Sequence, residues 1–172
     1  ERVAVGAKKS VMIAVEPPSS LRTILVAYDG SEPSKGALLL AEQLSLSTGL
    51  PLKAIHVVKE DSHVAQASST IEQGASLLRQ YKPVCQEGAG KEFGVSEQKS
   101  KVAIKDRTAS IMDTVFSVRV GAPGKTILEE AKKSEALLIL GAYGYKDPED
   151  NVLGSTTTQI VRSTRTSVLI YR

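Results

Sequence analysis

The chain has 172 residues, the size of one ordinary domain with a sizeable core. Its hydrophobic fraction of 41% is typical of a soluble globular protein, and no apolar run approaches the ~20 residues that a membrane-spanning helix needs. The net charge of +3 arises from interspersed acidic and basic residues, which does not indicate a nucleic-acid partner. The single cysteine, Cys85, excludes an intrachain disulfide and favours a cytoplasmic location.

The first half of the chain predicts one β-α-β unit. The run 24–28 is followed by apolar residues at helical spacing over 33–48 and by a second run, 54–58. Runs that are apolar at almost every position are typical of strands buried on both faces. Before this unit, 10–15 is a possible extra strand within an N-terminal extension over 1–22.

The second half continues the alternation of helices and strands. The expected elements are a helix over 66–81, a partly polar strand over 114–120, a helix over 125–133, a strand over 136–140, a helix over about 156–164 and a strand over 167–171. The glycine-containing, mixed-charge stretch 82–110 predicts an irregular surface excursion and not a second domain.

This alternation predicts a parallel sheet with right-handed crossovers. We therefore expect an α/β fold, an open parallel five-stranded sheet with helices on both faces, Rossmann-like, with the possible extra N-terminal strand. The expected organisation is the extension 1–22 followed by one domain over 23–172.

A glycine-containing segment follows the strand 136–140. Two residues separate Gly141 from Gly144, and nine residues separate Gly144 from Gly154 and Ser155, where a helix is expected to begin. Small residues let a ligand approach the backbone, and amides at a helix N-terminus stabilise phosphate oxygens. An isolated pair of glycines would only mark a loop, but here four positions agree in spacing.

This spacing resembles the nucleotide-binding signature of the ATP-binding universal stress proteins. Residues 24–31, Ile-Leu-Val-Ala-Tyr-Asp-Gly-Ser, look like the first strand and turn of that family. Residues 56–58 look like its second strand, and 120–123 look like the exit of its third strand. The resemblance covers about 23–58 and 115–171, and it implies the adenine-nucleotide-binding version of the fold.

The resemblance also implies a set of ligand contacts. Adenosine would face Ala27, Asp29 and Val57, the nucleotide would be lined by Leu140, Gly141 and Gly144, and the phosphates would meet Gly154, Ser155 and Thr156. Asp29 and Gly141 both follow strand ends, where open α/β sheets bind ligands. Asp29, in Asp-Gly-Ser, can also serve as a turn or cap residue.

The ligand that the resemblance implies is ATP, or ADP or AMP, with Mg²⁺ held through the phosphates. It also implies a homodimer through the C-terminal strand, 166–172, which is apolar and terminal enough for edge pairing. No protein partner can be named from the sequence.

Other candidate residues carry weaker signals. The loop after Tyr145 is mainly acidic, where relatives in the family often carry basic residues, and Asp147, Glu149 or Asp150 could approach a magnesium ion. A solvated acidic loop is the simpler interpretation, so no metal ligand is assigned. His56, inside an apolar strand, is interpreted as a packed histidine, and no catalytic residue is assigned.

Three functional hypotheses follow. The first is a nucleotide-dependent regulatory or stress-response module without turnover. The second is a slow ATP hydrolase or phosphotransferase, although the Gly-x-x-x-x-Gly-Lys-Ser/Thr phosphate loop is absent and no base can be nominated. The third is a dimeric interaction protein of the same fold that no longer binds nucleotide, a hypothesis that the acidic loop favours.

Overall fold

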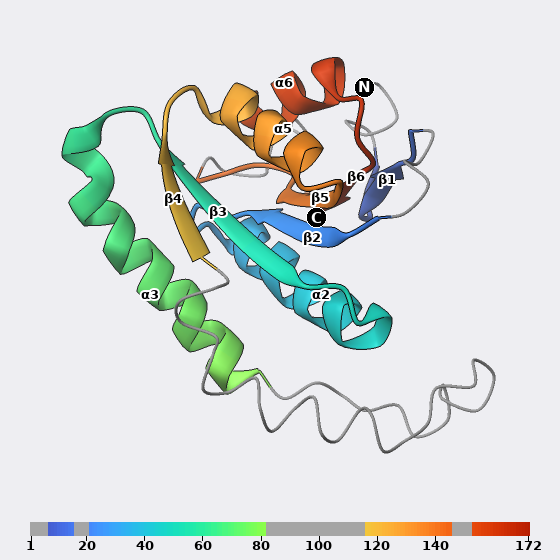
Figure 1. Ribbon diagram of the computed structural model, residues 1–172, viewed down its shortest axis with the longest axis horizontal. Helices are drawn as coiled ribbons and strands as arrows, with labels where there is room; N and C mark the ends of the chain where they lie inside the picture. Colours follow the sequence, from blue (N-terminus) through green and yellow to red (C-terminus); the bar gives the residue numbers. More distant parts are fainter. Residues whose placement is uncertain (1–6, 16–20, 82–115, 146–152) are drawn as a thin grey trace.

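The computed structural model describes residues 7–15, 21–81, 116–145 and 153–172. Strands and helices alternate along these segments (Figure 1). The elements are β1 (Val11–Ile13), β2 (Thr23–Ala27), α2 (Glu32–Thr48), β3 (Leu52–Val58), the 3₁₀ helix η1 (Asp61–His63), α3 (Val64–Gln80), β4 (Phe116–Val120), α5 (Pro123–Lys133), β5 (Ala136–Gly141), α6 (Ser155–Ser163) and β6 (Val168–Tyr171). The excursion expected over 82–110, Cys85 and the acidic loop with Asp147, Glu149 and Asp150 lie outside the described residues.

The strands form one six-stranded sheet in the order β1-β6-β5-β2-β3-β4. Strands β2 to β6 run parallel to one another, and β1 pairs antiparallel with β6. The α/β fold with five parallel strands is therefore confirmed, and so is the extra N-terminal strand within 10–15.

Helices cover both faces of the sheet. Figure 1 shows α2 and α3 on one side and α5 and α6 on the other. Alternate residues of each inner strand enter one of two apolar clusters: Ile24 and Val26 pack toward α2 and α3, whereas Leu25 packs toward α5 and α6. Because both faces are covered, the strand has to be apolar at every position, which is the pattern that the sequence has.

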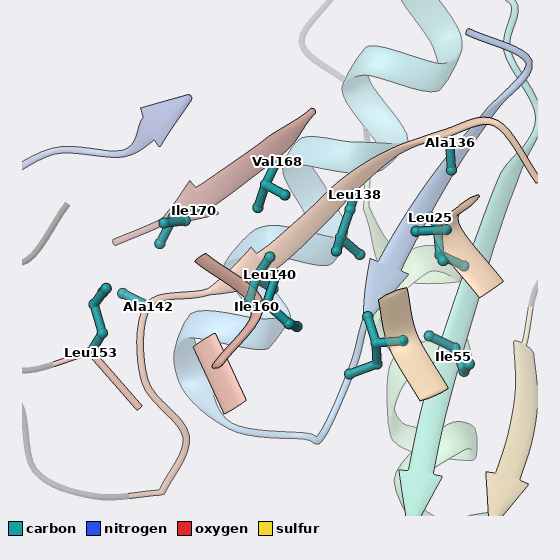
Figure 2. Packing of buried hydrophobic residues seen from close by; sticks show 12 residues of the cluster. Leu25, Ile55, Ala136, Leu138, Leu140, Ala142, Leu153, Ile160, Val168 and Ile170 are labelled. Atoms are coloured by element: carbon teal, nitrogen blue, oxygen red, sulfur yellow. The ribbon is translucent and has the colours of Figure 1, made fainter. Parts of the chain in front are cut away.

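The cluster beneath α5 and α6 crosses most of the sheet width. Figure 2 shows Leu25, Leu138 and Val168, from three strands, with Ile160 of α6 among them. Each of these side chains is at most 1% exposed. Burial of this extent stabilises the fold by roughly 1.5–3 kcal/mol for each large aliphatic side chain.

Strand β6 is not at the edge of the sheet. It lies between β5 and β1, and β1 belongs to the same chain. The expectation that 166–172 offers an open edge is therefore wrong for this arrangement of the chain, because the N-terminal strand takes the outer side of β6. The homodimer itself stays a prediction.

Candidate functional site

The strand order reverses between β2 and β5. From β2 the chain proceeds outward to β3 and β4, and α5 then returns it to the opposite side of β2, where β5 lies. The last paired residues of the two strands are Ala27 and Leu140. The turn after β2 and the loop after β5 therefore emerge side by side, where open α/β sheets bind ligands.

Asp29 organises the turn after β2. Its Oδ1 accepts hydrogen bonds from the Ser31 backbone N–H at 3.0 Å and from Ser31 Oγ at 2.5 Å. The turn role expected of this aspartate is therefore real. Its other oxygen, Oδ2, faces the loop after β5, since a Cβ built on Gly144 would lie 3.1 Å from it. One carboxylate thus shapes the turn and faces the switch point, the place between β2 and β5 where the strand order reverses.

Gly144 and Gly154 lie close to each other across the loop after β5. The backbone N–H of Gly154 donates to Ala142 O at 2.8 Å, and a Cβ on Gly154 would lie 3.5 Å from Gly144 N. Helix α6 begins at the next residue, and its Thr157 Oγ1 donates to Gly141 O at 2.9 Å. The first turn of α6 is therefore anchored to the carboxyl end of β5.

Close packing against helix α2 explains why residue 141 is a glycine. A Cβ at this position would lie 2.8 Å from Pro33 Cβ and 3.0 Å from Ser34 N, at the start of α2. Leu140 is 3% exposed and belongs to the core, so its side chain is not open to a ligand. Ala27 and Val57 are half-buried and pack against the same core cluster.

The predicted residues thus divide into two groups. Asp29, Gly144 and Gly154 meet at the carboxyl edge of the sheet, next to the exposed Ser155 and half-buried Thr156 at the start of α6. The remaining four are the strand residues Ala27, Val57, Leu140 and Gly141, whose side chains or Cα positions are engaged in packing. A nucleotide contact of any of them stays a prediction.

A sequence model of the universal stress protein family matches residues 20–172. The chain belongs to the universal stress protein family. A search of curated protein sequences found no match.

Solved structures of this family resemble the present universal stress protein over nearly its whole length. A universal stress protein in complex with cAMP shares 23% identity over 90% of this chain and 98% of the other, with a TM-score of 0.52. The protein from Archaeoglobus fulgidus in complex with dAMP shares 15% identity over 87% and 97% of the two chains, with a TM-score of 0.54. UspA from Lactobacillus plantarum shares 21% identity over 90% and 100%, with a TM-score of 0.53. At these identities the likeness supports the fold.

In this universal stress protein, Tyr145 joins the two loops of the site. Its Oη donates to Asp29 O at 2.8 Å, although the residue is 79% exposed. The hydroxyl lies against Gly30, whose φ of +85° and missing Cβ leave room for it. Burial of the hydroxyl and then the Asp29 carboxylate raise the pKa of Tyr145, against a lowering by Lys35. Sequence reasoning missed this contact because its partners are 116 residues apart.

Tyr28 and His56 meet beneath the site. His56 Nδ1 lies 2.8 Å from Tyr28 O, and because a carbonyl only accepts, Nδ1 donates. His56 is therefore a packed histidine with a partner, as expected. The Tyr28 ring is 2% exposed and meets the Phe116 ring edge-on at 6.0 Å between centroids.

Two surveys of the described residues were negative. Within 7–15, 21–81, 116–145 and 153–172, no group of three or more His, Cys, Asp or Glu residues is placed to hold a metal ion. None of the helices in these segments is both long enough and apolar enough to span a membrane.

Proposed function

We propose that this universal stress protein binds ATP and acts as a nucleotide-dependent regulatory module. The observation that supports this best is the meeting of Asp29, Gly144 and Gly154 at the switch point, directly before the N-terminus of α6. Two relatives of the same fold are complexes with an adenine nucleotide, namely cAMP and dAMP.

The residues at the switch point suit the parts of such a ligand. Asp29 Oδ2 would accept a hydrogen bond from the adenosine portion, since Oδ1 is already engaged by Ser31. Gly144 and Gly154 have no side chains, so the backbone at these two residues would let a phosphate approach closely. The free amides in the first turn of α6, at Ser155 and Thr156, would receive phosphate oxygens, which the helix dipole also favours. When bound, Mg²⁺ would neutralise phosphate charge.

Regulation is favoured over turnover because the two residues that could act as a base, Asp29 and His56, already hold hydrogen bonds within the fold. Asp29 Oδ1 accepts two hydrogen bonds within its own turn, and His56 Nδ1 is bonded to Tyr28 O. In this proposal Asp29 Oδ2 serves the adenosine portion, and His56 stays bonded to Tyr28 O, so neither group is assigned as a base. Slow hydrolysis is the second outcome to be tested, and a fold that binds partners without nucleotide is the third.

The test is calorimetric titration of the folded protein with ATP, with and without Mg²⁺, after any copurified nucleotide has been released and identified. We expect a clear binding heat for one nucleotide per chain. In the Gly144→Val variant, the new side chain would fill the space beside Asp29 Oδ2, so we expect affinity to fall about tenfold or more, which corresponds to ~1.4 kcal/mol. Gly144 does not have a positive φ, so the valine adds no strain of that kind.

The matched control changes a glycine away from the site. Gly49 ends α2 with φ of +74° and has nothing within 4 Å of its Cβ position, and asparagine tolerates that conformation. Gly49→Asn should bind ATP as the parent does. Folded parent protein that gives neither heat nor copurified nucleotide would reject the proposal in favour of the nucleotide-free interaction protein. Steady phosphate release that Gly144→Val abolishes would favour the hydrolase.

A further inference from the structure

The side chain of Tyr145 spans the two loops that meet at the switch point. Tyr145 directly follows Gly144 in the loop after β5, and its Oη donates to Asp29 O, in the turn after β2, at 2.8 Å. A Cβ built on Gly30 would lie 2.8 Å from this Oη and 3.1 Å from Thr70 Cγ2 of α3. The side chain therefore reaches from the loop after β5 to the turn after β2 and ends near α3.

The ring of Tyr145 is exposed although its hydroxyl is held. Among the exposed large hydrophobic side chains of the described segments, it is the most exposed, at 79%. Neither apolar cluster of these segments includes it, so core packing does not account for its position. A tyrosine has only two side-chain torsions, so one hydrogen bond fixes its ring at a low cost in conformational entropy. Much of a fixed aromatic ring is thus open to solvent at the switch point.

The Asp29 carboxylate lies beside this side chain. Its Oδ2 faces Gly144, the residue before Tyr145, and the backbone oxygen of Asp29 accepts the Tyr145 hydroxyl. Both ends of the Tyr145 side chain are therefore close to Asp29, and a ligand group that is held by Oδ2 comes within reach of the ring. Aromatic side chains stack on nucleobases of every kind, because each base has a π face.

We propose that Tyr145 is a specificity-determining residue of the nucleotide site, whose ring stacks on the base of the bound nucleotide and favours purines over pyrimidines. This inference rests on the proposed nucleotide binding and adds to it the residue that selects the base. A purine has two fused rings and overlaps the tyrosine ring more fully than a pyrimidine does, so it stacks more strongly. The hydrogen bond to Asp29 O holds the ring in place before the nucleotide arrives.

Two variants separate the ring of Tyr145 from its hydroxyl. Tyr145→Leu removes the ring, whereas Tyr145→Phe keeps the ring and removes the hydrogen bond to Asp29 O. Because the side chain is exposed, both variants should fold. In calorimetric titration with ATP, we expect the affinity to fall about tenfold or more in Tyr145→Leu, the loss of one stacked base, and at most about threefold in Tyr145→Phe. Equal losses in the two variants would mean that Tyr145 only ties the loops together, and would overturn the proposal.

Titration with CTP and with inorganic triphosphate tests the choice of base. The parent should bind ATP at least several-fold more tightly than CTP, and Tyr145→Leu should lose most of this preference. Inorganic triphosphate has no base, so the parent and Tyr145→Leu should bind it equally. A parent without the preference, a preference that the leucine leaves unchanged, or a loss for triphosphate as large as that for ATP would overturn the proposal.

A second readout does not depend on affinity. A stacked aromatic ring shifts the NMR signals of the base that lies on it, so the adenine H2 and H8 protons of bound AMP should move upfield in the parent and in Tyr145→Phe. In Tyr145→Leu this part of the shift should be missing. Equal shifts in the parent and in the leucine variant would contradict stacking on this ring.

The matched control changes a tyrosine at the opposite edge of the sheet. Tyr81 follows α3, whose 17 residues lead the chain away from the carboxyl end of β3 (Figure 1). Tyr81→Leu should bind ATP as the parent does. A parent that binds ATP and a Tyr145→Leu variant that binds it equally well would reject the role of Tyr145 alone. A folded parent with neither binding heat nor copurified nucleotide would reject the nucleotide module and this role with it.

Discussion

Tyr28 carries a polar atom that the core does not satisfy. Its Oη is buried, and it has no hydrogen-bond partner in the part of the chain that the structure describes. A buried hydroxyl without a partner costs about 1–3 kcal/mol of stability. The ring itself packs edge-on against Phe116 and stabilises the α2 and α3 side of the core. The two effects oppose each other within one side chain.

Tyr28→Phe separates them. The variant keeps the ring and removes the unpartnered hydroxyl, so we expect the free energy of unfolding at neutral pH to rise by about 1 kcal/mol. Denaturant titration of the parent and of Tyr28→Phe measures this difference in the free energy of unfolding. Tyr28→Leu is the control, because it removes both the hydroxyl and the ring contact, and it should be less stable than Tyr28→Phe by about 0.5–1.5 kcal/mol. A phenylalanine variant that is less stable than the parent would mean that the hydroxyl has a partner in solution.

At the scale of elements, the strands were predictable and their order was not. Each inner strand is apolar along its whole length because it is covered on both faces, so local sequence alone indicates it. The edge position depends on which distant segment pairs with β6. The four-residue similarity between 10–13 and 167–170 is too short to recognise without the pairing in view.

In the candidate site, too, local features could be predicted from the sequence and contacts between distant residues could not. Gly144, Gly154 and the start of α6 follow from local spacing, because glycines and a helix start leave a sequence signal. The contact between Tyr145 and Asp29 left none, since the tyrosine reads as an ordinary loop residue and its partner is a distant backbone carbonyl. Gly141 has the expected identity, yet the first turn of α2 already accounts for it.

Helix α2 and strand β6 are in close contact at Gly36. A Cβ at this position would overlap the ring of Tyr171. Gly36→Ala gains about 1 kcal/mol in helix propensity, but overpacking against a ring held between helix and sheet costs about 1–3 kcal/mol. We expect a net loss of about 1 kcal/mol in the free energy of unfolding, measured by denaturant titration.

The control for this contact is a double-mutant cycle. Tyr171→Leu removes the ring, so Gly36→Ala in that background should no longer destabilise and should recover the gain in helix propensity. The expected coupling is about 1–3 kcal/mol. Equal effects of Gly36→Ala in both backgrounds would mean that the Tyr171 ring moves aside without cost, and that α2 is not held against β6 at this point.

For the molecule as a whole, the ion pairs should make the free energy of unfolding depend only weakly on pH. The described residues contain exposed pairs between Arg22 and Glu135, Lys35 and Glu32, and Lys125 and Glu129. Exposed pairs of this kind typically contribute 0–1 kcal/mol each. The tyrosines beneath the site are different, because burial, followed by the charges of Tyr145, Asp29 and Glu32, raises the pKa of Tyr28 from 10.0 to about 12.

This shift makes the whole fold less stable in alkali. Between pH 10 and about 12 the unfolded chain has lost the Tyr28 proton while the folded chain keeps it, so the unfolded state binds fewer protons and the free energy of unfolding falls as pH rises. Below pH 10 both states are protonated, and above about 12 both are ionised. The free energy of unfolding therefore changes with pH on account of Tyr28 only within that window. Denaturant titrations at several pH values, with tyrosinate absorbance followed in parallel, should show a steeper decline in the parent than in Tyr28→Phe. Lysines titrate in the same range in both proteins and cancel in the comparison. If the two declines were equal, Tyr28 would ionise as readily in the folded chain as in the unfolded one, and the hydroxyl would have to be open to water.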